Sequence, residues 1–443
     1  MMHWKKITRT GNIILRCHST WPFHRIFETM PSIFPAQSLK PFEHKEFRLF
    51  IIARLFLIMA LRMLGTVAAY KLFKLTQSSF SIGLAGLSEF IPVFLLALYA
   101  GHVIDKSDKR TLLLKGVLTY SLCVIALIII TSAWFEKNVH SNSPEFFFYA
   151  VIFFTGIIRA FTGPTTHAII AQLVPRDVLQ YAANISSSTW LLASITGHAS
   201  AGFFIAWFGV HITFYIILVY VLVAAGLIFF IKKKPVLNPQ KDMPAWESVK
   251  EGLKFVYNNK IMLGAISLDL FAVLFGGAVA LIPEFADKIL KVGPIGFGWL
   301  NAAMDIGSVI MIAILTIWPM KKKQGYRLMF AVAGFGLCII LFGISGWYWL
   351  SFIALMAAGM LDGISVIVRG TILQLTTPDD KRGRVSSVNS MFINSSNELG
   401  QFESGFMAKA MGAAPSVIFG GCMTLLVVVF TWFKAPGLRK FEY

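Results

Sequence analysis

Several charged side chains stand within long apolar stretches of the chain, where a charge is unusual. They are Arg62, Glu89, Arg159, Asp305, Asp362, Arg369 and Glu398. If these stretches cross a lipid bilayer, a charge near its centre costs at least about 2.5–3.5 kcal/mol, so such a residue faces a partner or a water-filled cavity. A carboxyl group in that setting can take up and release a proton, and a nearby cation favours the release. We therefore predict that this set either couples protons to a conformational change or forms buried ion pairs.

Two of these acids, Glu89 and Asp305, occupy matching places in the sequence. Glu89 precedes Asp105 by the same interval as Asp305 precedes Lys321, and a basic cluster follows in both cases. We expect the two acids to lie at similar depth on corresponding helices, as proton carriers. A permanent ion pair between Arg62 and Glu89, which would only hold helices together, is the first alternative. A position closer to the membrane surface is the second.

The acid Asp362 and the cation Arg369 belong to one apolar run. Their spacing places them on one helix face, about two turns apart. A direct bond is not expected at that separation. We predict instead that both join a shared polar network.

Polar side chains form a stripe along a predicted helix over 383–410. Its members recur at steps of three and four residues: Ser387, Ser390, Asn394, Asn397, Glu398 and Gln401. That spacing places them on one helix face, and a weaker stripe over 182–207 contains Ser187, Ser194 and His198. We predict that both stripes line a water-filled cavity. Polar packing between helices, which is worth about 0.6 kcal/mol per hydrogen bond, is the alternative.

A short segment with charged residues joins the apolar runs over 79–102 and 111–134. It contains Gly101, Asp105, Lys106, Lys109 and Arg110. A glycine permits two helices to approach closely, a carboxylate can accept hydrogen bonds at a helix end, and cations can remain among anionic headgroups. The segment therefore indicates a contact site on the cytoplasmic side of a membrane. The alternative is a basic loop that only fixes the topology.

The composition is that of an integral membrane protein. Of the 443 residues, 56% are hydrophobic and 14% are charged, whereas soluble domains contain about 25% charged residues. Apolar runs of about 20 residues can span a bilayer as helices. We place them at roughly 47–72, 79–102, 111–134, 146–170, 182–207, 209–231, 261–286, 295–319, 326–345, 347–374, 383–410 and 412–434. The sequence therefore predicts an all-α integral membrane protein with twelve transmembrane helices in two sets of six.

An internal repeat relates these two sets. At one constant offset Pro175 falls on Pro378, and three glycines, Gly156, Gly197 and Gly202, fall on Gly359, Gly400 and Gly405. The same offset pairs Arg159 with Asp362 and His198 with Gln401. Repeats of this kind build two halves around a cavity near the bilayer midplane. We therefore predict two pseudo-symmetric six-helix halves.

The remaining segments complete the domain organisation. We assign residues 1–46 to an N-terminal tail, 47–231 and 261–434 to the two halves, 232–260 to a cytoplasmic linker and 435–443 to a C-terminal tail. We expect Met30 to be the true start of the chain, and an organellar transit peptide over the preceding residues is the alternative. Pro235, Pro239 and Pro244 interrupt the linker. The pattern after Pro244 predicts an amphipathic helix that lies in the membrane interface.

Cations are concentrated on one side of the predicted membrane domain. With the N-terminus in the cytoplasm, the inner segments hold most lysines and arginines between the runs, including Lys232, Lys233 and Lys234. This is the positive-inside pattern, so we predict a multi-pass protein of the inner (plasma) membrane with both termini cytoplasmic. The cations form no single face, so the net charge of +18 does not indicate a nucleic-acid partner.

The charged loop segment resembles a motif of the major facilitator superfamily, and the resemblance covers about residues 45–435. Gly101, Asp105, Lys106, Lys109 and Arg110 fall on the loop 2–3 motif G-x-x-x-D-[RK]-x-G-R-[RK]. Asp108 stands where that motif has its second glycine. The resemblance makes this segment a conformational latch. We expect Asp105 to hold the second helix to a neighbouring helix end in the outward-open state.

Other motifs resemble subgroups of the same superfamily. Arg159 followed by Gly163 is similar to the fourth-helix motif of proton-coupled members. Gly197-His198 with Gly202 occupies the place of the fifth-helix Gly-Pro antiporter motif, with a histidine instead of the proline. Three further places resemble the exporter branch that includes enterobactin and macrolide exporters. They are Leu75-Thr76, Pro175 and Arg382-Gly383-Arg384-Val385.

The resemblance implies a secondary active transporter that works by alternating access. It implies export of a small amphipathic molecule, such as a drug, siderophore or metabolite, by proton antiport. We expect a small-molecule substrate, protons and membrane lipids as partners, and a monomeric protein. A lipid or lysolipid flippase on the same scaffold and an uptake permease for a small solute are the alternatives.

Motifs of other protein classes are absent from the sequence. It contains no P-loop of the G-x-x-x-x-G-K-[ST] kind, no H-x-x-x-H pair and no cysteine cluster. A P-loop would indicate nucleotide hydrolysis, and the other two patterns would indicate a metal site. We therefore expect a protein that is not an enzyme and that has no metal site and no cofactor.

Overall fold

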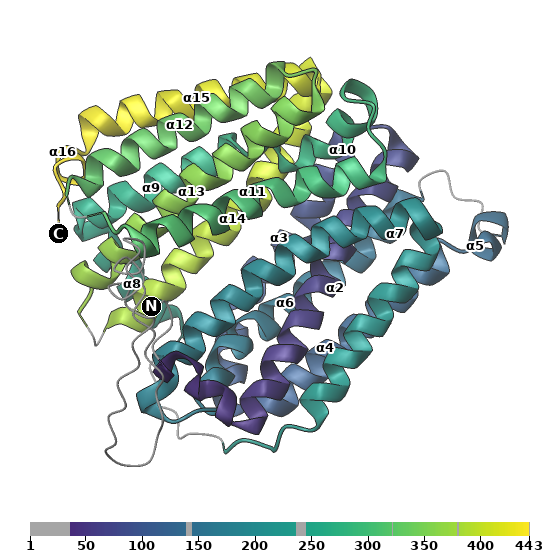
Figure 1. Cartoon of the computed structure of the whole chain (residues 1–443), viewed down its shortest axis with the longest axis horizontal. Coiled ribbons are helices and arrows are strands. Elements are labelled where there is room, and N and C mark those ends of the chain that lie inside the picture. The colour runs from purple at the N-terminus through teal and green to yellow at the C-terminus, as the bar shows by residue number, and fades with distance from the viewer. Residues whose placement is uncertain (1–35, 139–143, 236–244, 321, 379–380, 443) are drawn as a thin grey trace, which may run out of the picture.

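The structure, a computed structural model, describes residues 36–138, 144–235, 245–320, 322–378 and 381–442. The expected start at Met30 and the segment 236–244 of the linker lie outside the described residues. Throughout the described ranges the regular secondary structure is helical, which confirms the all-α prediction. Figure 1 shows two bundles that meet at one end and diverge toward the end that carries α8.

The first bundle is built from the N-terminal half of the chain. Its long helices are α2 (Lys45–Thr76), α3 (Ser79–Lys106), α4 (Lys109–Ile130), α6 (Glu145–Ile170) and α7 (Leu179–Phe229), and its short ones are η1 (Ala36–Glu43), α5 (Ala133–Asn138) and η2 (Arg176–Val178). Helix α7 consists of two spans that meet at Gly209, where φ is +77°. Side chains are disfavoured in that left-handed region, so a glycine suits this turn.

The second bundle follows the linker. It contains α8 (Ala245–Asn258), α9 (Lys260–Phe275), η3 (Ala278–Leu281), α10 (Ile282–Glu284), η4 (Phe285–Ile289), α11 (Pro294–Ile317), α12 (Gln324–Ile344), α13 (Tyr348–Thr376), α14 (Arg382–Met411), α15 (Ala413–Lys434) and α16 (Pro436–Arg439). The elements from α9 to η4 form one broken span. The break lies at Gly276, where a Cβ atom would be 2.5 Å from the Phe335 ring.

The helices agree with twelve membrane spans. Within the described residues, ten segments are long and apolar enough to cross a membrane. One of these contains both spans of α7. Helix α14 is too polar to meet that criterion, yet it is 30 residues long and packs against α3 and α9. Its polar stripe explains why hydropathy alone does not detect it.

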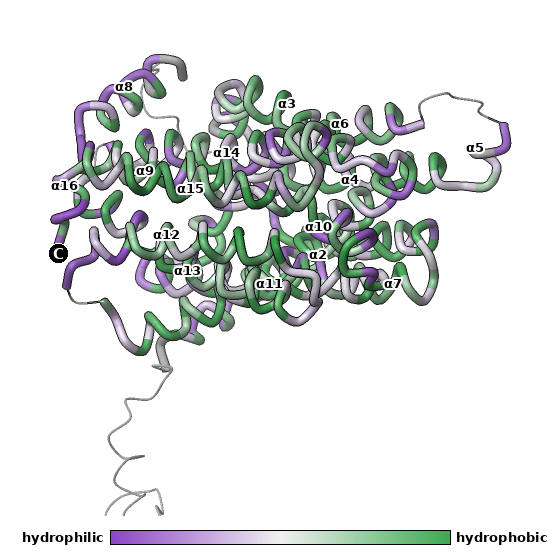
Figure 2. The backbone as a smooth tube through the Cα atoms, turned by 90° about the horizontal axis from the view of Figure 1, so that it is seen from above, coloured by the Kyte–Doolittle hydropathy of each residue, from purple (hydrophilic) through white to green (hydrophobic). Residues whose placement is uncertain are grey.

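Each bundle has its own hydrophobic core. Phe50, Phe148 and Phe214 are fully buried in the first, and Phe285 stacks on Phe342 in the second. Figure 2 shows hydrophobic residues along the middle of the long helices and hydrophilic ones at α8 and at the end of α5. Large apolar side chains such as Phe433 remain exposed, as expected for a surface that contacts lipid.

The two halves meet through glycines on one side of the molecule. We call the side that carries α8 the linker side and the opposite one the far side. A Cβ atom at Gly202 of α7 would lie 2.5 Å from the carbonyl oxygen of Pro294 in α11. At Gly405 of α14 it would lie 2.8 Å from the carbonyl oxygen of Ser79 in α3. At these glycines the helices of the two halves lie close to each other's backbone, and these contacts hold the halves together on the far side.

One prediction about close packing is wrong for this conformation. Gly101 was expected to let two helices approach closely, but a Cβ atom there would meet nothing within 4 Å. Gly101 belongs to the last turns of α3 on the linker side, where the bundles diverge (Figure 1). The close approaches occur instead at the glycines of the far side.

Candidate functional site

A cavity of about 490 Å³ lies between the two halves. It reaches Phe50 and Ile228 near the linker-side ends of α2 and α7, and Val279 and Pro283 toward the far side. Both halves contribute to its wall, and its volume is in the range of small-molecule sites. The charged residues that line it include Arg62, Glu89, Arg159 and Glu398, all of them predicted site residues.

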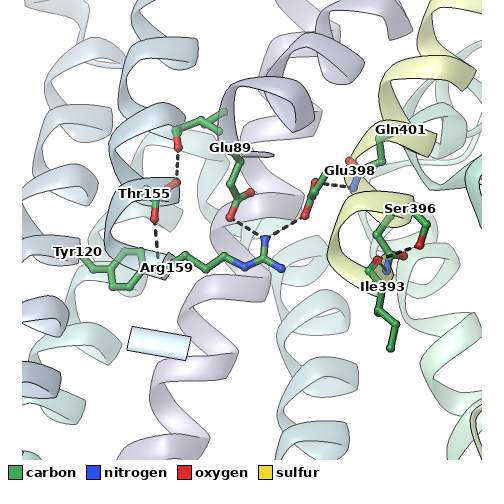
Figure 3. A network of polar contacts seen from close by, with 10 residues as sticks. Glu89, Tyr120, Thr155, Arg159, Ile393, Ser396, Glu398 and Gln401 are labelled. Carbon is green, nitrogen blue, oxygen red and sulfur yellow. Dashed lines mark hydrogen bonds and ion pairs between the residues drawn. The ribbon is translucent and has the colours of Figure 1, made fainter. Parts of the chain in front are cut away.

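Arg159 joins two carboxylates inside this cavity. Its Nη1 atom lies 2.9 Å from Glu89 Oε1 and 2.9 Å from Glu398 Oε1. Glu89 and Arg159 belong to α3 and α6 of the first half, whereas Glu398 belongs to α14 of the second (Figure 3). The amide of Gln401 donates to the other oxygen of Glu398 at 3.1 Å. The Arg159 guanidinium therefore forms ion pairs with two acids and links the two halves.

A glycine one turn before Arg159 makes this cluster possible. A Cβ atom at Gly156 would lie 2.5 Å from the backbone oxygen of Glu89. Helix α6 therefore packs directly on α3 and carries Arg159 to Glu89. The Arg62–Glu89 ion pair considered from the sequence is not the arrangement found, because the partner of Glu89 is Arg159.

A second polar contact between the halves involves Asp305 of α11. The hydroxyl of Ser194 in α7 donates to Asp305 Oδ2 at 2.5 Å, and His198 Nε2 lies 3.9 Å from the same oxygen. His198 Nδ1 also shares a hydrogen bond of 2.7 Å with the hydroxyl of Thr66 in α2. The two predicted acids, Glu89 and Asp305, thus both lie where α3 or α11 faces the opposite half.

Arg62 lies over an aromatic ring and not beside an acid. Its guanidinium carbon is 4.8 Å from the ring centre of Trp190, and both residues line the cavity. This is a cation–π contact between α2 and α7. Arg62 is therefore a cavity residue whose charge has no partner at ion-pair distance within the described residues.

Asp362 and Arg369 lie in a separate polar cluster of the second half. Arg369 pairs with Asp269 of α9, and both side chains are only 8% exposed. Its Nε atom donates to the Ser365 hydroxyl at 3.2 Å. Asp362, Ser365 and Asp269 line one small cavity. Asp269 was not among the predicted site residues, although it is an acid within the apolar run over 261–286, as Glu89 is within its own run.

The predicted polar stripes divide into three groups. His198, Asn394 and Gln401 line the cavity. Ser194 is buried against Asp305. Ser187, Ser387, Ser390 and Asn397 are exposed and do not belong to the cavity wall in this conformation.

The charged segment over 101–110, which forms the end of α3 and the start of α4, makes contacts within the first half. Arg110 Nε donates to the carbonyl oxygen of Ile231 at 3.0 Å, and Arg110 also donates to that of Phe229 at the end of α7. Lys109 is buried and donates to the carbonyl oxygens of Ile104 and Ser107, and Lys106 is exposed. The side chain of Asp105 lies outside the described part of the structure, so its role as a latch stays a prediction.

Asp108, at the place of the motif's second glycine, is the N-cap residue of α4. Its carboxylate accepts hydrogen bonds from the backbone N–H groups of Arg110 at 3.2 Å, Thr111 at 3.3 Å and Lys234 at 2.9 Å, and from the Thr111 hydroxyl at 2.5 Å. Burial alone would raise the pKa of Asp108, but these hydrogen bonds outweigh it and lower the pKa below its usual value. Asp108 thus caps α4 and ties it to the linker.

Polar contacts between the halves also close the far side. Lys74 at the end of α2 pairs with Asp287 of η4, and the Ser79 hydroxyl donates to Glu284 at 2.6 Å. Lys288 donates to Glu284 at 3.0 Å and to the carbonyl oxygen of Gln77 at 3.1 Å. These residues lie at the ends of helices far apart in sequence, so no local pattern identified them.

Comparisons with known proteins agree with this architecture. The Major Facilitator Superfamily sequence profile matches residues 50–401. The chain is 24% identical over 373 residues to the uncharacterised MFS-type transporter YfiS of Bacillus subtilis, covering 81% of this chain and 85% of that protein. It is 23% identical over 407 residues to the enterobactin exporter EntS of Escherichia coli, covering 90% and 94%.

Solved structures share the fold. A crystal structure of a variant of the nucleoside transporter NupG has a TM-score of 0.70 at 15% identity, covering 88% of this chain and 99% of that one. A D-xylose–proton symporter has a TM-score of 0.68 at 13% identity, covering 89% and 98%. With the profile match over most of its length, the chain belongs to the Major Facilitator Superfamily and is a membrane transporter, not an enzyme.

Proposed function

We propose that this transporter exports a small amphipathic molecule across the inner membrane in exchange for protons. We take the linker side as cytoplasmic, because the cations concentrate there. The cavity then extends toward the cytoplasm, while the far side is closed by Lys74–Asp287 and Ser79–Glu284. The conformation is an inward-facing one, ready to receive a substrate from the cell.

The observation that carries the proposal is the bridge from Arg159 to Glu398 between the halves. A single guanidinium cannot neutralise two carboxylates, so the cluster of Glu89, Arg159 and Glu398 accommodates one additional proton. Protonation of Glu398 would remove the charged contact between α6 and α14 and leave Arg159 paired with Glu89. Proton uptake would thereby change how strongly the halves are held together in this part of the cavity.

The contact of Asp305 with Ser194 and His198 is a second polar contact of this kind, between α11 of one half and α7 of the other. Here too an acid of one half is held by donors of the other. Charges that break and re-form between the halves are a means of linking proton binding to the rocking of two repeats. We assign proton coupling to these two clusters together.

Two further observations favour export of an amphipathic molecule. The relative EntS, which matches 90% of this chain, is named as an enterobactin exporter. The cavity wall combines charged residues with apolar ones such as Leu57, Ile58 and Leu61. A substrate with an apolar body and a polar group would fit this combination.

Transport in proteoliposomes tests the proposal. We expect Glu89→Gln, Asp305→Asn and Glu398→Gln each to reduce outward transport of fluorescent amphipathic compounds under an imposed pH gradient by about tenfold. Exchange of the same compounds without a gradient should persist, because exchange requires no net proton movement. Glu247→Gln is the control, since Glu247 is an exposed glutamate of α8 outside the Arg159 cluster.

Two results would contradict the proposal. Normal pH-driven rates in all three variants would exclude proton coupling through these acids. Equal losses in gradient-driven transport and in exchange would indicate that the acids bind substrate or maintain the fold.

A further inference from the structure

We propose that the transported molecule carries an acidic group, and that Arg62 and Arg54 of α2 bind this group in the cavity. The inference rests on the proposed transport through this cavity, but it does not depend on proton coupling. The proposed export of an amphipathic molecule does not specify the charge of the substrate, and the two arginines assign a negative one.

The negative charges of the cavity are already engaged. Glu89 and Glu398 both contact Arg159 at 2.9 Å. Asp305 accepts the hydroxyl of Ser194 at 2.5 Å and lies 3.9 Å from His198. A cationic substrate would have to displace these donors before it could pair with a carboxylate.

Arg62 is positively charged and available to a ligand. It lines the cavity, and its cation–π partner Trp190 contacts the face of the guanidinium at 4.8 Å. Asp305, Glu398 and Glu89 all lie beyond ion-pair distance from it. A guanidinium stacked on a ring retains N–H donors at its edge, and these match the planar geometry of a carboxylate or the oxygens of a phosphate.

Arg54 provides a second cation nearer the linker side. It lines the cavity with His167 of α6, and its Nε atom donates to the carbonyl oxygen of Ser186 at 3.3 Å. No acid among the described residues lies at ion-pair distance from Arg54. Its side chain is only 7% exposed, and a buried guanidinium without an acid is costly unless a ligand or water compensates it.

The spacing of the two arginines suits an amphipathic acid. Arg54 precedes Arg62 by eight residues, which on one helix is about 12 Å along the same face. Leu57, Ile58 and Leu61 line the cavity between them. An acidic group that enters from the linker side would meet Arg54 first and Arg62 deeper in the cavity, while its apolar body contacts these side chains.

Charge-selective labelling of a cysteine tests this assignment directly. The native residues Cys17, Cys123, Cys338 and Cys422 are replaced by serine, and the full chain is placed in phosphatidylcholine nanodiscs. Gly65→Cys reports on Arg62, because Gly65 lines the cavity and a Cβ atom there meets nothing within 4 Å. Ile58→Cys reports between the two arginines. Each thiol is reacted with the anionic sulfonatoethyl or the cationic trimethylammonioethyl methanethiosulfonate.

The measured ratio is the reaction rate with the anionic reagent divided by the rate with the cationic reagent. We expect this ratio to be about tenfold higher at Gly65→Cys than for a free thiol in solution, since a nearby unit charge acts oppositely on the two reagents. Arg62→Gln should reduce this ratio at Gly65→Cys several-fold, and Arg54→Gln should reduce it at Ile58→Cys. Arg48→Gln is the matched control, because Arg48 is an exposed arginine of α2 outside the cavity wall. Octanoate in the buffer should slow the anionic reagent.

Several outcomes would overturn the inference. They are a ratio at or below that of a free thiol, a ratio that Arg62→Gln leaves unchanged, and no reaction with either reagent. Slowing by phosphatidylglycerol in the nanodisc but not by octanoate would place a lipid headgroup at the site and contradict binding of a water-borne acid. The labelling uses no pH gradient, so its failure is distinguishable from a failure of proton-coupled export.

Discussion

Arg159 of α6 donates a hydrogen bond of 2.9 Å to Glu398 of α14 and so joins the two halves of the transporter inside its cavity. The same Nη1 atom also donates a hydrogen bond of 2.9 Å to Glu89 Oε1. The guanidinium is therefore the common partner of two acids that would otherwise repel each other. Removal of the cation should harm the protein more than removal of either acid.

Arg159→Gln is expected to lower the free energy of unfolding by about 1–3 kcal/mol, because it leaves two carboxylates without a charged donor. The value is at the low end for a buried ion pair, since the Arg159 side chain is 40% exposed to the cavity and water screens it. Glu398→Gln should cost less, because a glutamine oxygen still accepts from Arg159. Thermal unfolding followed by tryptophan fluorescence measures the difference.

The double variant Arg159→Gln with Glu398→Gln is the control for this prediction. It removes the cation and one of the two acids, so it should unfold at a higher temperature than Arg159→Gln alone. A double variant less stable than Arg159→Gln would mean that Glu398 stabilises the fold through other contacts, and the reasoning from shared charge would fail.

The sequence identified these charges but not their pairing. Glu89 and Arg159 stand out within apolar runs, because a charge in a membrane span is costly wherever it points. Glu398 is the acid of the polar stripe along α14. Their partners depend on how closely two helices approach, and that distance is fixed at Gly156, where α6 lies on the backbone of α3. A glycine in an apolar run gives no indication of which helix it will contact.

The number and order of the spans followed from hydropathy and from the repeat, since both are local or periodic properties. The far-side contacts did not follow, because Lys74 and Asp287 are 213 residues apart and lie at helix ends, where charges are ordinary. The close approach expected at Gly101 is not found in this conformation. The motif suggested close packing, but in this conformation the halves diverge on the side where Gly101 lies.

The cap at Asp108 makes a pH-dependent contribution to stability. Its pKa is lower in the folded protein than its usual value, so the folded state favours the carboxylate. The stabilisation is fully present above the unfolded-state pKa of about 3.9 and is lost as the pH falls through the lower, folded-state value. Asp108→Ala should therefore lower the free energy of unfolding by about 0.5–2 kcal/mol at neutral pH.

Thermal unfolding at pH 7 and at pH 3 checks this sign. The difference in melting temperature between the wild type and Asp108→Ala should shrink at the acidic pH, where the carboxyl group is mostly protonated in the unfolded state. Asp177→Ala is a matched control, because Asp177 is exposed in η2. A difference that grows on acidification would contradict the assigned pKa direction.

Glu284 is expected to stabilise closure of the far side. It accepts from Ser79 at 2.6 Å and from Lys288 at 3.0 Å, and its side chain is 17% exposed. Because contacts near the surface contribute up to about 1 kcal/mol, Glu284→Ala should raise the far-side-open population by no more than about fivefold. Distances between spin labels at Leu75 and Met411, exposed positions of α2 and α14, would lengthen in that population.

The pair of Asp269 and Arg369 should be important for stability and not for coupling between the halves. Both residues belong to the second half, and each side chain is 8% exposed. Breaking a buried pair by removing one partner costs about 3–5 kcal/mol, so Asp269→Asn should markedly lower the melting temperature. Adding Arg369→Gln should recover part of the loss. An unchanged melting temperature in Asp269→Asn would show that water or Asp362 compensates Arg369.

Gly202 offers a test of the far-side contact that involves no charge. A Cβ atom there would lie 2.5 Å from the carbonyl oxygen of Pro294 and 3.0 Å from the Cα atom of Gly298. Both neighbours are backbone atoms, so α7 and α11 must separate to admit a methyl group. Overpacking of this kind costs about 1–3 kcal/mol, and here the cost falls only on conformations with the far side closed.

Gly202→Ala should therefore increase the far-side-open population by at least about fivefold, measured with the same labels at Leu75 and Met411. Gly226→Ala in the same helix is the matched control, because a Cβ atom at Gly226 meets nothing within 4 Å. That substitution should leave the distances unchanged, since it only improves helix propensity by about 1 kcal/mol. Equal distance distributions in the two variants would mean that α7 and α11 do not separate when the far side opens.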